Sequence, residues 1–360
     1  MAGMLNFTVG PVVSCPEVLK IASMSAPYFR TSEFSDIMFQ NEKLILKFLN
    51  APDDSRCVFL TTSGTGAMES CVMNILNNQD KVIVINGGSF GQRFVKLCEL
   101  YGYNMAEVKC KFGHQVRKEQ LYALAGKGYT ALLVNMNETS SGVLYDMPLI
   151  SKFCKENNIL LIIDAISAFI TDEIDMTEFN AAAIITGSQK ALAVQPGIAV
   201  IALAPAAINR IQKNKEKCMY LSLKDALKNM ERGQTPFTPA VTTLVQINKR
   251  LTVIEENGGI KAEQERVAWL ASYFRNKIRN YPFELIAGDK SNAVTALYPT
   301  TCGAKKIVHL LKDEYNIWAC PNGGDLADEV FRIGHIGNIT KENYDTLFAA
   351  FDDMKIQGVI

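Results

Sequence analysis

The sequence lacks the features that mark nucleic-acid-binding, membrane and secreted proteins. Its 37 Lys and Arg residues balance 37 Asp and Glu residues, so the formal net charge is zero. With no basic run either, nothing predicts attraction to a nucleic acid or an anionic membrane. No apolar run approaches the roughly 20 residues of a membrane span. The N-terminus has no cationic stretch followed by an apolar one, so we expect no signal peptide and a cytoplasmic protein.

Closely spaced cysteines are also missing. The nine cysteines are scattered singly along 360 residues, which excludes the spacing of zinc knuckles and redox pairs. An odd number of cysteines in a chain of this length fits reduced thiols in a cytosol. We expect most of them to be small core residues and predict no metal site.

What the sequence does contain is a regular alternation of apolar runs and helical patterns. Hydrophobic residues make up 48% of the chain, enough for a large core and for two domains. The expected strands are residues 58–60, 82–85, 131–134, 159–163, 182–186 and 198–203. Their alternation with helices predicts an α/β protein with a mostly parallel sheet and helices on both faces.

The C-terminal third of the chain has a different pattern of apolar residues. Its apolar spacing predicts a long helix over residues 239–256, followed by a smaller α+β unit. We therefore predict a large domain over residues 1–250 that includes the N-terminal segment, and a small domain over 251–360.

Residues that could bind a ligand or take part in a reaction follow the predicted strands, at the sheet edge where α/β proteins bind ligands. Residues 63–66 (Ser-Gly-Thr-Gly) offer backbone amides to an anion, Phe90 offers a flat surface, and Thr139 offers a hydroxyl. Each has an ordinary alternative: a glycine turn, a core phenylalanine or a polar capping loop.

Two charged residues complete this set. Asp164 closes an apolar strand, where a carboxylate needs a cationic partner, and Lys190 follows the next strand, where an amine can form a Schiff base. Alone, Asp164 can be a helix cap or metal ligand, and Lys190 a surface residue. Together, the five features match the phosphate, ring, phenolate, pyridinium and aldehyde of pyridoxal phosphate.

At these residues the chain resembles the class V aminotransferases, which are fold-type I pyridoxal-phosphate enzymes. It is similar to alanine–glyoxylate (serine–pyruvate) aminotransferases and to 2-aminoethylphosphonate–pyruvate transaminases. The motifs are Ser-Gly-Thr-Gly (63–66), Gly-Ser-Phe-Gly-Gln-Arg (88–93), Glu-Thr-Ser-Ser-Gly-Val-Leu (138–144), Asp-Ala-Ile-Ser-Ala-Phe (164–169), Gly-Ser-Gln-Lys-Ala-Leu (187–192) and Phe-Arg-Ile-Gly (331–334). The resemblance implies a large domain with a mostly parallel seven-stranded sheet flanked by helices, and a smaller C-terminal α+β domain.

The resemblance also implies residue roles. Lys190 becomes the Schiff-base lysine, Asp164 the pyridinium partner and Phe90 the stacking ring. The implied cofactor contacts are Ser63, Gly64, Thr65, Phe90, Thr139, Asp164, Gln189, Lys190 and Thr238. Arg332 matches the arginine that binds the substrate's acidic group. A planar guanidinium suits this role because it can donate two hydrogen bonds to a carboxylate. The ordinary alternative for Arg332 is a surface salt bridge. Gly10 matches a glycine that lines the substrate pocket.

The expected oligomeric state rests on Thr238. It matches a residue that reaches the cofactor phosphate of the neighbouring subunit, which implies a homodimer with shared active sites. The chain departs from the family at Thr235, where an aromatic residue is usual, and at residues 9–11, where Val-Gly-Pro replaces Pro-Gly-Pro.

The expected reaction is transfer of an amino group from a small amino acid of the alanine or serine type to glyoxylate or pyruvate. Residues 331–337 and 220–223 favour the aminoethylphosphonate alternative instead. Arg30 is open to two interpretations, a reader of a second anionic group or a surface residue.

Two further classes stay open. A cysteine desulfurase-like lyase would attack sulfur with a loop thiol, for which Cys302 and Cys320 are candidates, but it usually stacks a histidine where this chain has Phe90. A cofactor-binding regulator would need a DNA-binding domain, for which the chain has no residues to spare.

Overall fold

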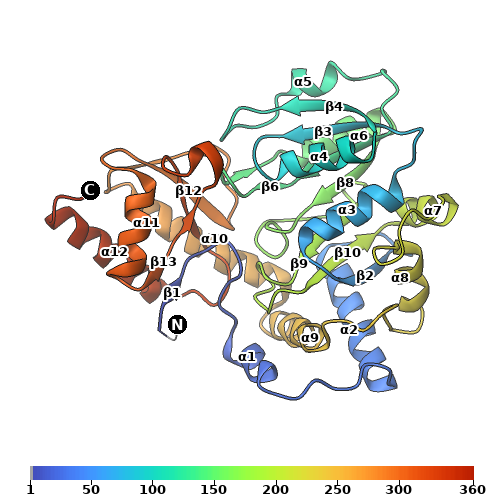
Figure 1. Ribbon diagram of the computed structural model, residues 1–360, viewed down its shortest axis with the longest axis horizontal. Coiled ribbons are helices and arrows are strands. Elements are labelled where there is room, and N and C mark those ends of the chain that lie inside the picture. The colour runs from blue at the N-terminus through green and yellow to red at the C-terminus, as the bar shows by residue number, and fades with distance from the viewer. Residues whose placement is uncertain (1–2) are drawn as a thin grey trace.

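A seven-stranded sheet forms the centre of the larger part of the molecule. The computed structural model describes residues 3–360, and Figure 1 shows the sheet between helices. The strands run in the order β2-β10-β9-β8-β5-β3-β4. They are β2 (Arg56–Thr61), β3 (Lys81–Asn86), β4 (Asn104–Lys109), β5 (Ala131–Asn135), β8 (Leu160–Asp164), β9 (Ala181–Gly187) and β10 (Ile198–Leu203). Only β10 runs antiparallel to its neighbours, so the mostly parallel sheet is confirmed.

The sequence pattern explains which strands were predicted. Strands β5, β9 and β10 are buried along their whole length, and their continuous apolar runs reflect burial on both faces. The edge strand β4 is largely half-buried or exposed and contains Asn104 and Glu107. Because its polar residues interrupt the apolar run, β4 escaped prediction.

Helices connect and cover these strands. In the larger part they are α1 (Pro16–Ala22), α2 (Ser32–Phe48), α3 (Gly64–Ile75), α4 (Gly91–Leu100), α5 (Lys118–Tyr122), α6 (Met147–Glu156), α7 (Pro205–Lys213), α8 (Leu223–Met230) and α9 (Val241–Glu256). Helix α6 begins where the Asp146 carboxylate accepts a hydrogen bond from the Leu149 amide and a proline occupies its first turn. Helix α9 confirms the long helix expected over 239–256.

The C-terminal residues build a second, smaller α+β unit, shown in orange and red in Figure 1. Its antiparallel sheet contains β11 (Phe283–Leu285), β12 (Val294–Pro299), β14 (Cys320–Pro321) and β15 (Phe331–Gly334). Helices α10 (Gly259–Ile278), α11 (Ala304–Asp313) and α12 (Lys341–Ile356) accompany it, with a short 3-10 turn, η1 (Gly324–Leu326). This unit has its own hydrophobic core, and it confirms the smaller α+β part of the expected fold.

The N-terminal segment joins the smaller unit. Strand β1 (Leu5–Asn6) pairs in parallel with β13 (Ile317–Trp318), and Phe7 lies in the second core. Helix α9 crosses the division predicted at residue 250, and Leu251 belongs to the first core. The exact division stays a prediction.

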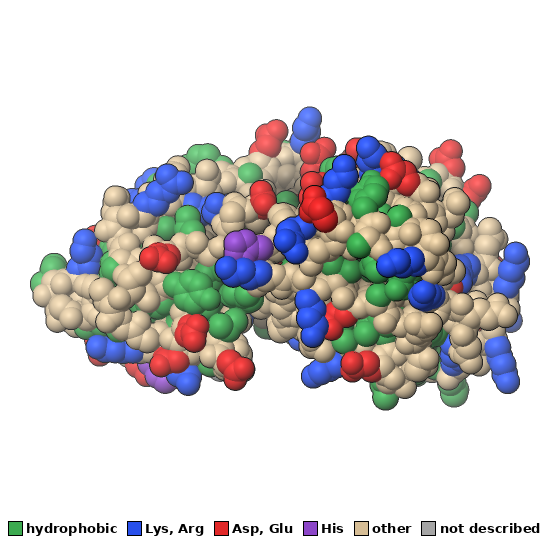
Figure 2. All heavy atoms as spheres, turned by 90° about the horizontal axis from the view of Figure 1, so that it is seen from above, with side chains coloured by type: hydrophobic (Ala, Val, Ile, Leu, Met, Phe, Trp, Pro, Cys, Tyr) green, Lys and Arg blue, Asp and Glu red, His purple; other side chains and the backbone are tan. Residues whose placement is uncertain are grey.

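The described surface agrees with the balanced composition. Figure 2 shows acidic and basic side chains interspersed over one face rather than gathered by sign. Within residues 3–360, no helix combines the length and hydrophobicity that crossing a membrane requires.

Candidate active site

The carboxyl edge of the parallel strands brings the candidate residues to one side of the sheet. Strands β2, β3, β5, β8 and β9 share one direction, so their C-terminal ends meet at that edge. The segments that leave these ends contain, in turn, residues 63–66, Phe90, Thr139, Asp164 and Lys190. The predicted convergence of these segments therefore follows from the topology.

Lys190 is buried, with 8% of its surface exposed. Its amine donates a hydrogen bond of 2.6 Å to the Val9 carbonyl oxygen. Burial and, after it, the positive charge of Arg332 lower the pKa of Lys190 to about 8. A side chain on Gly10, whose φ is +119°, would place its Cβ 2.8 Å from the Lys190 Cδ. Gly10 therefore lies directly against this lysine.

Asp164 is also buried, and its Oδ1 accepts a hydrogen bond of 2.8 Å from the Ile166 amide. Burial raises the pKa of Asp164 to about 6, while the Ile166 amide and the Lys190 charge oppose that rise. Asp164 and Lys190 affect each other's pKa, each favouring the charged form of the other. A buried carboxylate of this kind gains from a cationic partner.

Phe90 is half-buried at the start of α4. The Lys190 Nζ lies 5.8 Å from its ring centroid, and the Arg93 Cζ lies 4.5 Å from it. The ring thus stands beside the candidate lysine with part of its surface available, which disfavours the core alternative considered for it.

Sequence reasoning missed the residue that holds this loop, Glu138. Its fully buried carboxylate accepts hydrogen bonds from the amides of Phe90 and Gly91, the latter at 3.0 Å. It also accepts from the side chain of Asn135 at 3.0 Å and from the Ser140 hydroxyl at 2.5 Å. Donors from the segment after β3, from the end of β5 and from the segment after β5 therefore converge on one charge. The sequence signal that could have revealed Glu138 is an acidic residue shortly after an apolar strand.

The start of α3 has the character of an anion site. Its N-cap, Ser63, makes no capping hydrogen bond, and its first turn contains no acidic residue. A Cβ on Gly64 or Gly66 would collide with Ile166 or Thr62 respectively. The glycines therefore permit close packing at a helix N-terminus whose amides suit a phosphate. Gln189 is half-buried beside Lys190 in sequence.

Thr139 and Arg332 lie in contact. The Thr139 hydroxyl is 2.7 Å from the Ser167 hydroxyl. Arg332 donates to the Thr139 carbonyl oxygen at 3.2 Å and to the Pro321 carbonyl oxygen at 2.6 Å. Its Nε is buried and has no partner within residues 3–360. Arg332 is 8% exposed and forms no ion pair in that range, so the surface salt-bridge alternative is wrong.

Thr238 and Arg30 are linked by the segment before α9, whose Ala240 amide donates a hydrogen bond of 3.1 Å to the Thr61 hydroxyl at the end of β2. Thr238 is exposed on the segment before α9. Arg30 donates to the carbonyl oxygens of Thr235 and Pro236 at 3.0 and 3.1 Å. Its guanidinium therefore holds the segment that leads to Thr238.

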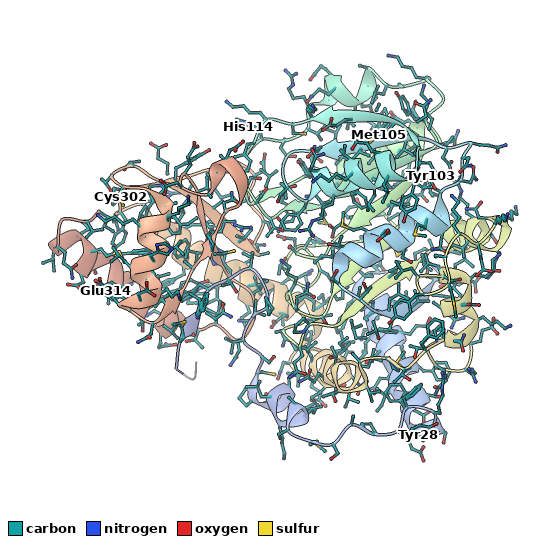
Figure 3. All side chains as sticks on the ribbon, viewed as in Figure 1. Tyr28, Tyr103, Met105, His114, Cys302 and Glu314 are labelled. Carbon is teal, nitrogen blue, oxygen red and sulfur yellow. The ribbon has the colours of Figure 1, made fainter. Side chains whose placement is uncertain are left out.

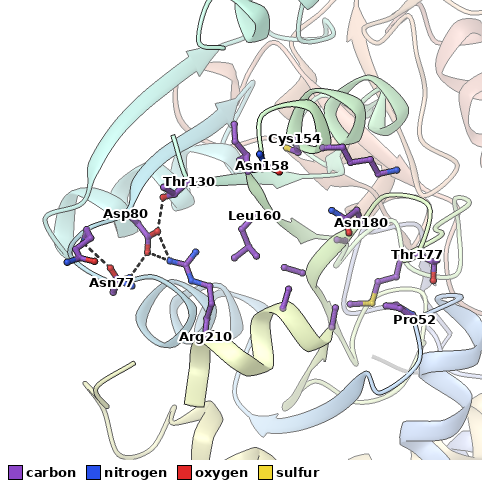
Figure 4. Close-up of a pocket in the computed structure, with 18 residues that line it drawn as sticks. Pro52, Asn77, Asp80, Thr130, Cys154, Asn158, Leu160, Thr177, Asn180 and Arg210 are labelled. Carbon is purple, nitrogen blue, oxygen red and sulfur yellow. Dashed lines mark hydrogen bonds and ion pairs between the residues drawn. The ribbon is translucent and has the colours of Figure 1, made fainter. Parts of the chain in front are cut away.

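A separate cavity of about 770 Å³ opens at the opposite edge of the sheet (Figure 4). Its polar wall contains Asp80, whose carboxylate pairs with Arg210 at 2.6 Å and accepts from the Thr130 hydroxyl at 2.7 Å. None of the candidate site residues lines this cavity. Asp80 and Arg210 in its wall are already paired with each other, and it plays no part in the constellation around Lys190.

Comparison with known proteins identifies the family. Residues 21–325 match the model of class-V aminotransferases. An uncharacterized aminotransferase of Methanocaldococcus jannaschii is 31% identical over 335 residues, covering 91% of this chain and 86% of that protein. A serine–glyoxylate aminotransferase of Hyphomicrobium methylovorum is 28% identical over 373 residues, covering 98% and 90%. The chain belongs to the class-V aminotransferases, whose members are pyridoxal-phosphate-dependent enzymes.

A solved structure supports the fold independently. The alanine–glyoxylate aminotransferase of a Nostoc species superposes with a TM-score of 0.92 at 22% identity, covering 99% of this chain and 96% of that one. At this identity the likeness shows the fold alone. It confirms the expected fold-type I architecture.

Proposed function

We propose that this aminotransferase moves an amino group from a small amino acid, of the alanine or serine type, to a 2-oxoacid such as glyoxylate or pyruvate. The observation that carries the proposal is the buried Arg332, which has an unpartnered Nε and acts electrostatically on Lys190. A guanidinium in this state can take a substrate carboxylate through two hydrogen bonds. The similarity to a serine–glyoxylate aminotransferase supports the same substrate class.

The residues present fit pyridoxal phosphate. The start of α3, with Ser63, Gly64 and Thr65, would hold the phosphate together with Gln189. Phe90 would stack on the ring. Thr139 would face the phenolate, Asp164 would pair with the ring nitrogen, and Lys190 would take the aldehyde in a Schiff base. When bound, the cofactor supplies an electron sink for the substrate's α-carbon.

The chain's own groups would then do the acid–base work. The pKa of Lys190, lowered to about 8, leaves its amine able to take the proton of the donor's α-carbon and return it as an acid. Asp164 would keep a proton on the ring nitrogen of the cofactor through its opposite charge. The Val9 carbonyl holds the amine in place between these steps.

Arg30 bears on the choice of donor. Both of its terminal nitrogens donate to main-chain carbonyl oxygens. Arg332 makes two bonds of the same kind, but of the two arginines Arg332 is the one with a buried Nε that has no partner within residues 3–360 and with an electrostatic effect on Lys190. We therefore take Arg332, not Arg30, as the arginine that binds the donor's acidic group. A donor with a single acidic group fits this arrangement, which holds for alanine and serine and also for 2-aminoethylphosphonate, so the last remains the alternative.

A donor–acceptor screen tests the substrate proposal. Alanine, serine and 2-aminoethylphosphonate are each paired with glyoxylate and with pyruvate, and the amino product is quantified by chromatography. We expect turnover with alanine or serine and none with the folded variant Lys190→Ala. Turnover with 2-aminoethylphosphonate alone would replace the proposal by its alternative.

A lyase alternative is favoured by one observation. Cys320 pairs with Arg332 across β14 and β15, so a thiol lies near the site. The other candidate, Cys302, lies in the smaller unit against its hydrophobic core (Figure 3). Sulfide release from cysteine at a rate above the transamination rate would support this lyase. We expect none, because Phe90 occupies the stacking position.

We also propose a homodimer in which Thr238 serves the partner's site. Tyr28, Met219 and Tyr220 leave 68%, 75% and 52% of their surfaces exposed. Tyr220 stacks on Phe237 at 5.4 Å, so this apolar surface continues to the segment that carries Thr238. Figure 3 shows Tyr28 at the end of the molecule remote from the smaller unit. Light scattering should give twice the chain mass of 39.8 kDa. A monomer that retains activity would contradict the shared site.

The cytoplasm is the proposed location. All nine cysteines are free thiols, and reduced thiols are typical of a reducing compartment.

A further inference from the structure

The residues predicted to hold the cofactor phosphate, Ser63, Gly64, Thr65 and Gln189, are called the cradle here, and none of them is charged. Ser63, Gly64, Thr65 and Gln189 offer hydroxyl, amide and backbone donors. A phosphate ester carries about −1.5 to −2 charges at neutral pH. A helix N-terminus supplies only about half a unit of positive charge. The cradle therefore needs a cation that the family resemblance did not assign.

We propose that Arg93 supplies this charge and binds the cofactor phosphate. The inference rests on the proposed binding of pyridoxal phosphate at the start of α3. Arg93 lies one helical turn after Phe90, and its Nη1 donates a hydrogen bond of 2.8 Å to the Thr65 hydroxyl. Its guanidinium carbon lies 4.5 Å from the Phe90 ring centroid. One side chain thus contacts both the cradle and the stacking residue.

Arg93 is available for an anion. Its side chain forms no ion pair within residues 3–360, and the contact with Thr65 is the one hydrogen bond of its guanidinium in that range. Most of its five donors are therefore free. Its positive charge reaches the catalytic groups, because it lowers the pKa of both Asp164 and Lys190. The guanidinium and the Lys190 amine also lie near the same aromatic ring, at 4.5 and 5.8 Å from the Phe90 centroid.

The chemistry favours arginine over lysine at this position. A planar guanidinium can lie against an aromatic ring and donate two parallel hydrogen bonds to a phosphate at the same time. The ammonium group of a lysine can provide the charge but not two parallel hydrogen bonds from one planar group. We therefore expect Arg93→Lys to retain part of the affinity that Arg93→Gln loses.

The test compares ligands with and without the phosphate. Apoprotein is titrated with pyridoxal phosphate and with pyridoxal, and binding is followed by absorbance and protein fluorescence. Arg93→Gln should weaken pyridoxal phosphate binding by roughly 10- to 100-fold, as expected for lost hydrogen bonds to a charged group, and change pyridoxal binding by less than about threefold. Arg117→Gln is the matched control, since Arg117 is an exposed residue whose side chain contacts Gln120.

The outcomes separate this inference from the proposed function. An equal loss for both ligands would overturn it, because Arg93 would then act by packing against Phe90. No loss for either ligand would also overturn it. If Arg93→Gln fails to fold, the same comparison with Arg93→Lys decides. Failure of wild-type protein to bind pyridoxal phosphate would overturn both proposals, whereas binding without transamination would overturn the function alone.

Discussion

The acidity of Lys190 leads to a prediction with a defined midpoint. Burial and the neighbouring Arg332 lower the pKa of Lys190 from 10.5 to about 8. At pH 7 this raises the neutral fraction of the amine from roughly 0.03% to roughly 9%, about 300-fold, because each pKa unit is a factor of ten. Since the neutral amine is the nucleophile, capture of pyridoxal phosphate by apoprotein should accelerate with pH up to about 8 and level off above it.

Stopped-flow absorbance measures this rate directly. Arg332→Gln removes a positive charge beside the amine and should move the midpoint upward, whereas Arg332→Lys keeps the charge and should leave the midpoint near 8. A wild-type midpoint near 10.5, or one that ignores Arg332→Gln, would refute the reasoning.

The same shift affects stability. Between pH 8 and 10.5 the unfolded state binds more protons at Lys190 than the folded state, so stability rises with pH across that window. Below pH 8 the buried charge costs up to about 3 kcal/mol, from 2.5 pKa units at 1.36 kcal/mol each. Apo Lys190→Met should therefore melt above the wild type at pH 7, and the gap should shrink towards pH 10.

Three further substitutions probe the site and its scaffold. Glu138→Gln should destabilise the protein by about 1–3 kcal/mol in denaturant unfolding, since the Gln side chain offers one oxygen to donors that now share two; unchanged stability would contradict the role of this charge in holding the loop. Arg210→Gln strands the buried Asp80 carboxylate and should cost about 3 kcal/mol, the lower end for a broken buried pair. The pKa of Asp80 is lowered because the Arg210 hydrogen bond and its other partners outweigh burial, so this cost should fade as the pH drops through the folded pKa of that carboxyl. Gly10→Ala places a methyl group against Lys190 and should lower kcat by roughly 100-fold, whereas full activity would show that the lysine tolerates displacement.

The sequence predicted the strands well where burial is complete. Strand β10 matches its expected range of 198–203, and β9 extends the expected 182–186 by one residue at each end. The edge strand β4 was missed because half of its surface faces solvent and its pattern is interrupted. The reversed direction of β10 was also not foreseen, since an apolar run carries no information about strand direction.

The candidate site was predictable only in part. Asp164 and Lys190 stand out because charges at the ends of apolar runs are rare. Glu138 and Arg93 act through partners 48 and 28 residues away in the chain, and such contacts exist only once the fold has formed. The role of Arg30 was open for the same reason, because its carbonyl partners are more than 200 residues distant.

The N-terminal segment connects two parts of the molecule that the reaction must coordinate. Strand β1 is fastened to the smaller unit through β13, and the Phe7 carbonyl oxygen accepts a 2.7 Å hydrogen bond from the Gly334 amide, two residues beyond Arg332. Two residues after Phe7, the Val9 carbonyl holds the Lys190 amine. Residues 5–9 therefore connect the smaller unit to the Lys190 amine, so that a movement of the smaller unit would change the position of the amine. Trimming the beginning of the chain should slow turnover although no catalytic side chain is removed.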